Sequence, residues 1–436
     1  MVDTGENNTS KITQWLSRSS DSQFSAYAIF AAFLAYFCMY AFRKPFTVGG
    51  FAGDGILGMD YKTSLIVFQV IGYTLSKFLG IKIVSETSGK NRAFRLITMI
   101  LIAEVSLLLF AFTPAPYNIF FLFLNGVPLG MVWGLVFGFL EGRHTSELLG
   151  AGLSASYILA SGFVKTVGQL VMGWGVSEFW MPAVTGLLFA LPFGFSVFLL
   201  NQIPPPTKAD EKLRTKRAPM YSKDRWKFFK TYAPGLIPLT GLYILLTGYR
   251  SFRDDFARQI WDALGYKGQA SIYTLSELPV ALSVLIALSL IFLIKDNKKA
   301  MRVIHYFMIF GAILIGASTL AFQSGLIGPV TWMVLLGMGL YLGYVPYGCV
   351  LFDRLIAAVG FVGTAGFMIY LTDAFGYVGS VSIMLYKNFA QAELSWLKFF
   401  INLSYLTSVV CTVCFALSLA YFAKQSRLGN LENRSN

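Results

Sequence analysis

The sequence predicts an all-α polytopic membrane protein with twelve transmembrane helices, arranged as two pseudo-symmetric six-helix bundles. Of its 436 residues, 56% are hydrophobic and only 13% are charged, whereas about a quarter of the residues in a soluble domain are charged. The apolar residues gather in stretches that, as helices, can cross the roughly 30 Å hydrocarbon core of a bilayer. A polar linker separates the first six stretches from the last six.

Each predicted span is an apolar run that ends where polar residues or prolines begin. Six runs precede the linker, at 24–46, 61–84, 96–113, 117–140, 149–175 and 180–200. Six follow it, at 232–250, 271–294, 303–323, 328–350, 357–385 and 399–423.

The polar segments predict the domain organisation. Residues 1–23 lack the apolar core and small-residue cleavage site of a signal peptide, so we expect an uncleaved cytoplasmic segment. Residues 24–200 and 232–423 form the two bundles, and 424–436 form a cytoplasmic tail. The linker, 201–231, opens with IPPPTKADEKLRTKR, whose prolines end the sixth span and whose charges hold it in water. Two such bundles describe the major facilitator architecture.

The net charge of +13 is explained by membrane topology. With an even number of spans and both termini inside, most lysines and arginines fall in cytoplasmic segments, as the positive-inside rule requires. The basic run 208–230 therefore orients the chain, with contact to anionic lipid as a secondary role. We expect no nucleic-acid partner.

The sequence offers no pattern for catalysis, a metal or a cofactor. Cys411 and Cys414 form a C-x-x-C in the middle of an apolar span, without a second ligand pair, and we interpret them as packing residues. His144 and His305 are far apart in the sequence. No P-loop is present, so direct drive by ATP is not expected. We predict that the protein is not an enzyme.

A tyrosine followed by an arginine seven residues later occurs in both halves. The pairs are Tyr36 with Arg43 and Tyr243 with Arg250, at an offset of 207 positions (36 to 243 and 43 to 250). An arginine near the middle of a bilayer costs about 2.5–3.5 kcal/mol on insertion scales. Two arginines related by pseudo-symmetry indicate a positive site for an anionic cargo. The alternative is that both only flank their helices and extend to the headgroups.

Hydroxyl and charged side chains share one face in several predicted spans, at i, i+4 or i+7 spacing. Such faces suit a wet cavity and are poorly matched to lipid. For Lys165, a structural ion pair is the main alternative. The members of these faces that we assign to substrate binding are Tyr36, Tyr40, Arg43, Tyr73, Lys77, Lys165, Tyr243 and Arg250. Asp373, which also lies on such a face, is assigned to gating or an ion pair.

Several motifs resemble the organophosphate:phosphate antiporters, which include the glycerol-3-phosphate and hexose-phosphate transporters. YFCMYAFRKPF resembles their first-span segment Y-x-x-x-Y-x-x-R-K-x-F, and GYTLSKF resembles their second-span G-Y-x-x-S-K-F. NGVPLGMVW is similar to their fourth-span G-x-x-x-G-M-x-W. YRSFRDD and GTAGFMIYLTDAFGYVG resemble segments of their seventh and eleventh spans.

This resemblance implies roles for individual residues. Arg43 and Arg250 would coordinate phosphate, with Lys77 adding positive field. Charge pairs that rearrange during transport would join Lys44 to Asp255 and Lys77 to Glu277. Lys165 stands where the family has a substrate-contacting histidine, and Asp373 is an acid that the family pattern lacks. Tyr36, Tyr40 and Tyr73 would line the cavity.

The sequence thus predicts a monomeric transporter in the bacterial cytoplasmic membrane that exchanges a phosphate ester for inorganic phosphate by alternating access. Asp373 and Glu104 keep proton-coupled anion symport open, since intramembrane acids can carry protons. A sensor that binds a phosphorylated metabolite without moving it is another alternative. A multidrug exporter fits the cationic cavity less well.

Overall fold

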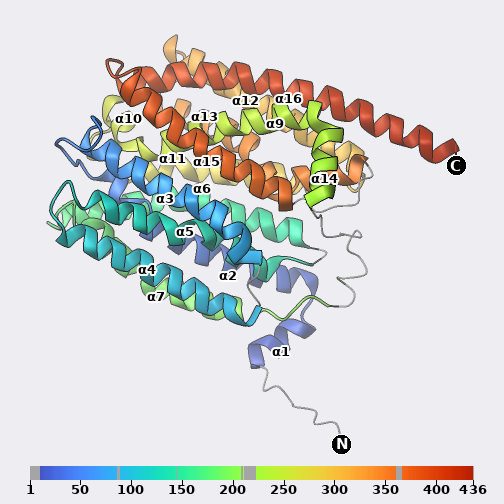
Figure 1. The fold of residues 1–436 in the computed structure, drawn as a ribbon, viewed down its shortest axis with the longest axis horizontal. Helices are drawn as coiled ribbons and strands as arrows, with labels where there is room; N and C mark the ends of the chain where they lie inside the picture. Colours follow the sequence, from blue (N-terminus) through green and yellow to red (C-terminus); the bar gives the residue numbers. More distant parts are fainter. Residues whose placement is uncertain are drawn as a thin grey trace, which may run out of the picture.

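The computed structural model describes residues 10–85, 89–143, 145–207, 210, 222–359 and 366–435, and long helices dominate these ranges (Figure 1). The helices up to the linker are α1 (Lys11–Arg18), α2 (Asp21–Met39), η1 (Tyr40–Phe42), η2 (Pro45–Val48), α3 (Tyr61–Ser85), η3 (Gly89–Asn91), α4 (Arg92–Phe112), α5 (Ile119–Leu140), α6 (Ser146–Gly173) and α7 (Met181–Asn201). Those after it are α9 (Ser222–Asp255), α10 (Ala257–Ala263), α11 (Ile272–Phe292), α12 (Asn297–Gln323), α13 (Pro329–Cys349), α14 (Leu351–Val359), α15 (Gly366–Phe389) and α16 (Trp396–Ser435).

The predicted all-α membrane fold is confirmed. Within the described residues, ten helices are long and apolar enough to cross a membrane. Of the two other predicted spans, 232–250 falls on α9, and 357–385 covers the end of α14 and most of α15. Residues 360–365 of the eleventh predicted span lie outside the described residues.

Several predicted boundaries were wrong. Helix α9 begins at Ser222, inside the predicted linker, α12 begins at Asn297, and α16 continues to Ser435. Two further errors lie beside the site described below. The first span was expected to reach residue 46, but α2 ends at Met39 and two short 3₁₀ helices follow, the second beginning at Pro45. The seventh was expected to end at Arg250, yet α9 continues to Asp255. Its last turn is charged, and a hydropathy pattern alone ends a span where charges begin.

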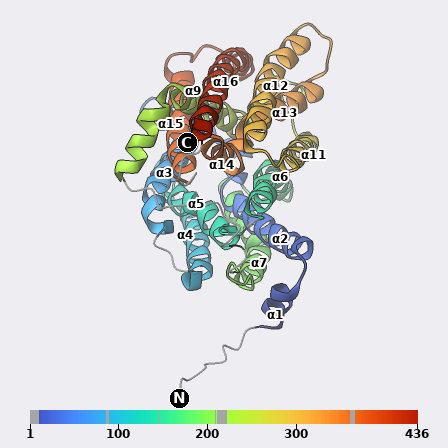
Figure 2. The same cartoon turned by 90° about the vertical axis from the view of Figure 1, so that its right-hand side faces the viewer.

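The helices form two groups that lie side by side. Figure 1 shows α2 to α7 in the lower half and α9 to α16 in the upper half, with α1 and the end of α16 on the same side of the molecule. Helices pack mainly within each group, for example α3 on α5 and α12 on α13. Between the groups, α6 packs on α11 and α3 packs on α15, as the end-on view in Figure 2 shows.

Glycines allow the closest helix contacts inside the first group. A Cβ atom on Gly72 of α3 would lie 2.2 Å from the carbonyl oxygen of Phe123 on α5. One on Gly126 of α5 would lie 2.2 Å from the carbonyl oxygen of Gln69 on α3. Small residues at such crossings let helix backbones approach one another in a membrane.

Large apolar side chains also remain on the outside of the molecule. Leu191 is 85% exposed, and Leu101, Ile286 and Val409 are more than half exposed. These residues lie within helices of membrane-spanning length. In water such a surface would be an aggregation hazard, whereas against lipid it is well solvated. The chain is therefore an integral membrane protein.

Candidate functional site: a tyrosine-rich cationic cavity

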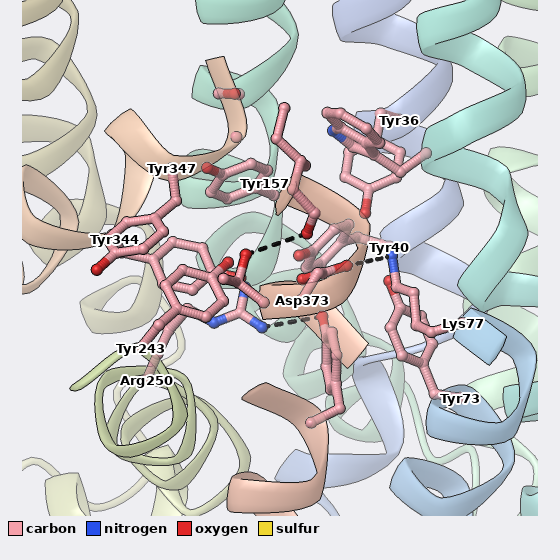
Figure 3. A pocket seen from close by; sticks show the side chains of 16 residues that line it. Tyr36, Tyr40, Tyr73, Lys77, Tyr157, Tyr243, Arg250, Tyr344, Tyr347 and Asp373 are labelled. Atoms are coloured by element: carbon pink, nitrogen blue, oxygen red, sulfur yellow. Dashed lines mark hydrogen bonds and ion pairs between the residues drawn. The ribbon is translucent and has the colours of Figure 1, made fainter. Parts of the chain in front are cut away.

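A cavity of about 520 Å³, including its open mouth, lies between the two helix groups (Figure 3). Eight tyrosines line it, together with the charged residues Lys77, Arg250 and Asp373. Figure 3 shows Arg250 beside Tyr243 on one side and Lys77 beside Tyr73 on the other, with Asp373 between them. The lining residues are Tyr36, Tyr40, Tyr73, Lys77, Trp133, Ser154, Tyr157, Tyr243, Arg250, Tyr344, Tyr347, Gly348, Ile369, Thr372, Asp373 and Tyr377.

Three cationic side chains converge on the ring of Tyr377, which projects from α15. The guanidinium carbons of Arg43 and Arg250 lie 5.9 and 5.7 Å from its centroid, and the ammonium nitrogen of Lys77 lies 5.7 Å from it. Arg250 also donates a hydrogen bond of 3.0 Å from Nη2 to the tyrosine hydroxyl. A ring face attracts cations at such distances. Tyr377 therefore helps to hold three like charges close together.

Arg250 occupies the cavity wall, as the sequence predicted. It lies near the C-terminal end of α9, is 8% exposed, and its guanidinium carbon lies 4.6 Å from the centroid of the Tyr344 ring. Tyr243, on the same face of α9 two turns earlier, packs on the rings of Tyr344 and Tyr347 with centroid separations of 5.1 and 4.3 Å. The arginine thus keeps a fixed orientation among aromatic rings.

Arg43 lies beside the cavity but does not line it. Its guanidinium carbon is 3.7 Å from the centroid of the Tyr73 ring, and Tyr73 is the residue that reaches the cavity. The arginine sits where α2 gives way to 3₁₀ turns, which leave carbonyl groups without helical partners. Gln69 donates to the carbonyl of Arg43 at 3.0 Å, and Asn125 donates to the carbonyl of Phe42 at 3.0 Å. These two buried amides, which the sequence reading missed, support the broken helix.

The charge pairs differ from the predicted ones at Lys77. Its ammonium nitrogen lies 2.9 Å from Oδ2 of Asp373, whereas Glu277 is paired with Arg253 at 2.6 Å. The predicted pair of Lys77 with Glu277 is therefore wrong. The reason is helix packing: Lys77 is on α3, which packs on α15, while Glu277 is on α11, which packs on α6 and α13.

Lys165 also lies elsewhere than predicted. It does not line the cavity; it forms an ion pair with a carboxylate oxygen of Asp254, and its Nζ donates to the Asp254 carbonyl at 2.6 Å. This is the structural ion pair that the sequence left open. Lys44 contacts the same Asp254 at 2.6 Å and its predicted partner Asp255 at 2.5 Å. The sequence reading missed Asp254 because its neighbour Asp255 was the acid that matched the antiporter pattern.

The charge cluster of Lys44, Lys165, Asp254 and Asp255 joins the two helix groups. It lies where α9 leads into α10, at the end of the molecule away from the chain termini (Figure 1). Arg258 of α10 donates to the carbonyl of Val48 at 2.5 Å. The hydroxyl oxygens of Thr166 on α6 and Thr274 on α11 are 2.8 Å apart. Lys62 of α3 donates to Gln259 at 3.3 Å. We call this set of contacts the closed end.

The arrangement matches solved structures over nearly its whole length. A D-xylose-proton symporter superposes with a TM-score of 0.62, 14% identity, and coverage of 91% of this chain and 97% of that one. A POT family transporter in complex with a thioalcohol-conjugated peptide gives a TM-score of 0.59 at 14% identity, covering 92% and 96%. A peptide transporter POT gives 0.60 at 13% identity, covering 96% and 99%. At these identities the likeness shows the fold alone, which is of the major facilitator type.

Sequence comparison identifies a family without assigning an activity. No protein of curated function matches the chain. One family profile does match, over residues 45–425, and this stretch includes the cavity residues from Tyr73 to Tyr377 and every residue named at the closed end except Lys44. The chain therefore belongs to DUF5690, a family of unknown function.

Proposed function

We propose that the protein is a secondary transporter of an organic anion, a phosphate ester that it exchanges for inorganic phosphate by alternating access. The observation that carries this proposal is the convergence of Arg43, Lys77 and Arg250 around Tyr377. One carboxylate, Asp373, lines the same cavity among the described residues. A site with this balance of charge favours anions over cations.

The buried arginines support a ligand-binding role over a structural one. Arg43 and Arg250 are 3% and 8% exposed, and neither forms an ion pair with any residue that the structure describes. Intramembrane arginines cost about 2.5–3.5 kcal/mol each on insertion scales. A guanidinium offers two parallel donors that match two phosphate oxygens, and an ammonium adds a point charge. A phosphate group is therefore the anion that this set suits best.

The tyrosine lining supports an organic group attached to that phosphate. Tyrosine presents an apolar ring face together with a hydroxyl that donates and accepts hydrogen bonds. Small-molecule sites commonly combine such surfaces with a few placed polar groups. The eight tyrosines give this cavity both kinds of surface beside Lys77 and Arg250.

Alternating access would use the closed end as a gate. We assign the two moving units to residues 24–200 and 232–423, joined by the linker 201–231. The ion pairs of Lys44 and Lys165 with Asp254 join these units, as does the contact between Thr166 and Thr274. For a ligand to enter from that side, these contacts must separate while the opposite ends of the helices approach one another.

Transport by purified protein in proteoliposomes tests the exchange mode. Uptake of radiolabelled phosphate should rise severalfold when the vesicles are preloaded with unlabelled phosphate, because a returning anion brings the site back to the outside. Uptake that is the same with empty and preloaded vesicles would refute exchange. The absence of uptake in both, with phosphate binding intact, would favour a sensor.

Conservative substitution tests the arginines. Arg250→Lys keeps the charge but loses the planar fork and the hydrogen bond to Tyr377. A hydrogen bond to a charged group contributes about 1.5–3 kcal/mol, so phosphate affinity should fall roughly tenfold to a hundredfold. Arg43→Lys should lower phosphate affinity less, because Arg43 lies beside the cavity against the ring of Tyr73.

Arg354→Lys is the matched control, because Arg354 lies on α14 outside the cavity and donates to Asn297 at 2.8 Å. Isothermal titration calorimetry with inorganic phosphate measures the affinity. Unchanged affinity in both Arg250→Lys and Arg43→Lys would show that neither arginine binds phosphate.

A further inference from the structure

We propose that Asp373 is an internal anion that holds Lys77 until the ligand arrives, and that each ligand anion displaces it and brings one proton into the site. This inference rests on the proposed anion-binding function of the cavity. It adds that anion binding is coupled to binding of a proton, and it identifies Asp373 as the residue that carries the proton.

The geometry places Asp373 where a ligand anion would lie. Its Oδ2 is 2.9 Å from Nζ of Lys77, and both side chains line the cavity. The Lys77 side chain is 9% exposed and that of Asp373 is 20% exposed, so the carboxylate faces the open volume. The pair also joins α3 to α15 across the two helix groups. In contrast, Arg250 has a hydroxyl and ring faces as its contacts.

Among the groups that face Asp373, Lys77 is the cation that forms an ion pair with it. Lys77 and Tyr73 face it from α3, Arg250 and Tyr243 from α9, and Tyr377 from its own helix. Tyr344 of α13 lies across the cavity. Arg250 is the cation that an entering phosphate would engage first, because no carboxylate among the described residues pairs with it. Lys77 is then the charge for which the ligand and Asp373 compete.

Competition for Lys77 creates the coupling. When a ligand anion binds Lys77 and Arg250, Asp373 keeps a negative charge beside the ligand's charges in a poorly hydrated cavity. Like charges at close range disfavour the ionised form of a carboxyl group, as does loss of a cationic partner. The Asp373 carboxylate therefore accepts one proton from the solvent and becomes a neutral carboxyl. Lys77 keeps its proton, and no bond of the ligand is made or broken.

This step has a consequence for transport. An anion and a proton enter the site together, so exchange of one anion for another also carries a proton in each direction. When no anion is available for the return step, the neutralising pair of Lys77 with Asp373 can re-form. The empty carrier then changes conformation with Lys77 neutralised inside the membrane. A proton gradient can therefore drive net anion movement.

Isothermal titration calorimetry of the full-length protein with inorganic phosphate tests the proposal. Titrations in two buffers of different ionisation enthalpy give the number of protons taken up per bound phosphate. Wild-type protein should take up about one proton more than Asp373→Asn, and this difference cancels the titration of phosphate itself. The ratio of the phosphate affinity of wild type to that of Asp373→Asn should fall about tenfold for each pH unit as the pH rises through neutrality, because wild type binds a proton together with the phosphate. Asp373→Asn should bind at least as tightly as wild type.

Glu104→Gln is the matched control, since Glu104 is another buried carboxyl but lies on α4 away from the cavity. It should keep the wild-type proton number. Three results would overturn the proposal: equal proton numbers in wild type and Asp373→Asn, loss of the extra proton in Glu104→Gln, or loss of phosphate binding in Asp373→Asn. The first two results would refute proton coupling at Asp373 but would leave the proposed phosphate site unaffected. If wild type itself fails to bind phosphate, the proposed function fails with the inference.

Discussion

The substitution Gly162→Ala should open the closed end without touching the cavity. Gly162 lies on α6, where that helix crosses α11 between the two helix groups. A Cβ atom built on it would lie 2.1 Å from the carbonyl oxygen of Tyr273 and 3.0 Å from Cγ of Glu277. The nearer obstacle is backbone, which cannot rotate aside as a side chain can. The two helices must therefore move apart.

The size of the effect follows from this geometry. Non-bonded carbon atoms make their best contact at about 3.5–4.0 Å, so α6 and α11 would have to separate by about 1 Å or more. Overpacking of this kind costs about 1–3 kcal/mol. Because the crossing belongs to the conformation in which this end is closed, the cost falls on that conformation alone. A difference of 1–3 kcal/mol changes the ratio of two conformations by about 5- to 150-fold.

Cross-linking measures the fraction of closed molecules. The hydroxyl oxygens of Thr166 and Thr274 are 2.8 Å apart across the same helix pair, so a Thr166→Cys, Thr274→Cys protein should cross-link readily with a short thiol reagent. Adding Gly162→Ala should lower the ratio of closed to open molecules by a factor in the range above, so cross-linking should slow by up to the same factor.

Gly72→Ala is the control for simple destabilisation. It creates an equally short contact, 2.2 Å to the carbonyl oxygen of Phe123, but within the first helix group. It should lower the melting temperature and leave the cross-linking rate unchanged. If Gly162→Ala folds normally and cross-links at the parent rate, the α6–α11 crossing does not report the closed conformation, and our reasoning about the gate is wrong.

Three further substitutions test buried charges through the free energy of unfolding. Asp254→Ala should lower the free energy of unfolding by about 3–5 kcal/mol, because both Lys44 and Lys165 lose their shared partner. Lys165→Met should lower it clearly less, because Asp254 keeps its contact with Lys44. Equal losses of stability in the two variants, measured by thermal unfolding, would contradict a shared role for Asp254. Glu104→Leu should stabilise the protein by about 1–3 kcal/mol, because both carboxyl oxygens are buried without a hydrogen-bond partner in the described structure. A lower melting temperature for that variant would show that Glu104 has a partner or a role that the present contacts do not reveal.

The candidate site was predictable to the extent that it depends on one helix at a time. Spacing of i, i+4 and i+7 placed Tyr36, Tyr40 and Arg250 on faces that do meet in the cavity. The same spacing could not show that Tyr73 lies against Arg43, because that contact joins two helices. Nor could it single out Tyr377 among the 22 tyrosines of the chain as the ring that three cations share.

The sequence by itself determined that this chain is a helical membrane protein with costly charges inside its spans. Those properties follow from composition and from runs of apolar residues, which are local. Tertiary structure decided which of these charges have an ion-pair partner among the described residues. Lys165 matched a substrate position in sequence, yet the approach of α9 gives it Asp254 as a partner. Asp373 carried no family role, yet the packing of α15 on α3 places it against Lys77. Pairing of this kind depends on which helices are neighbours, and a long-range contact leaves no trace in local spacing.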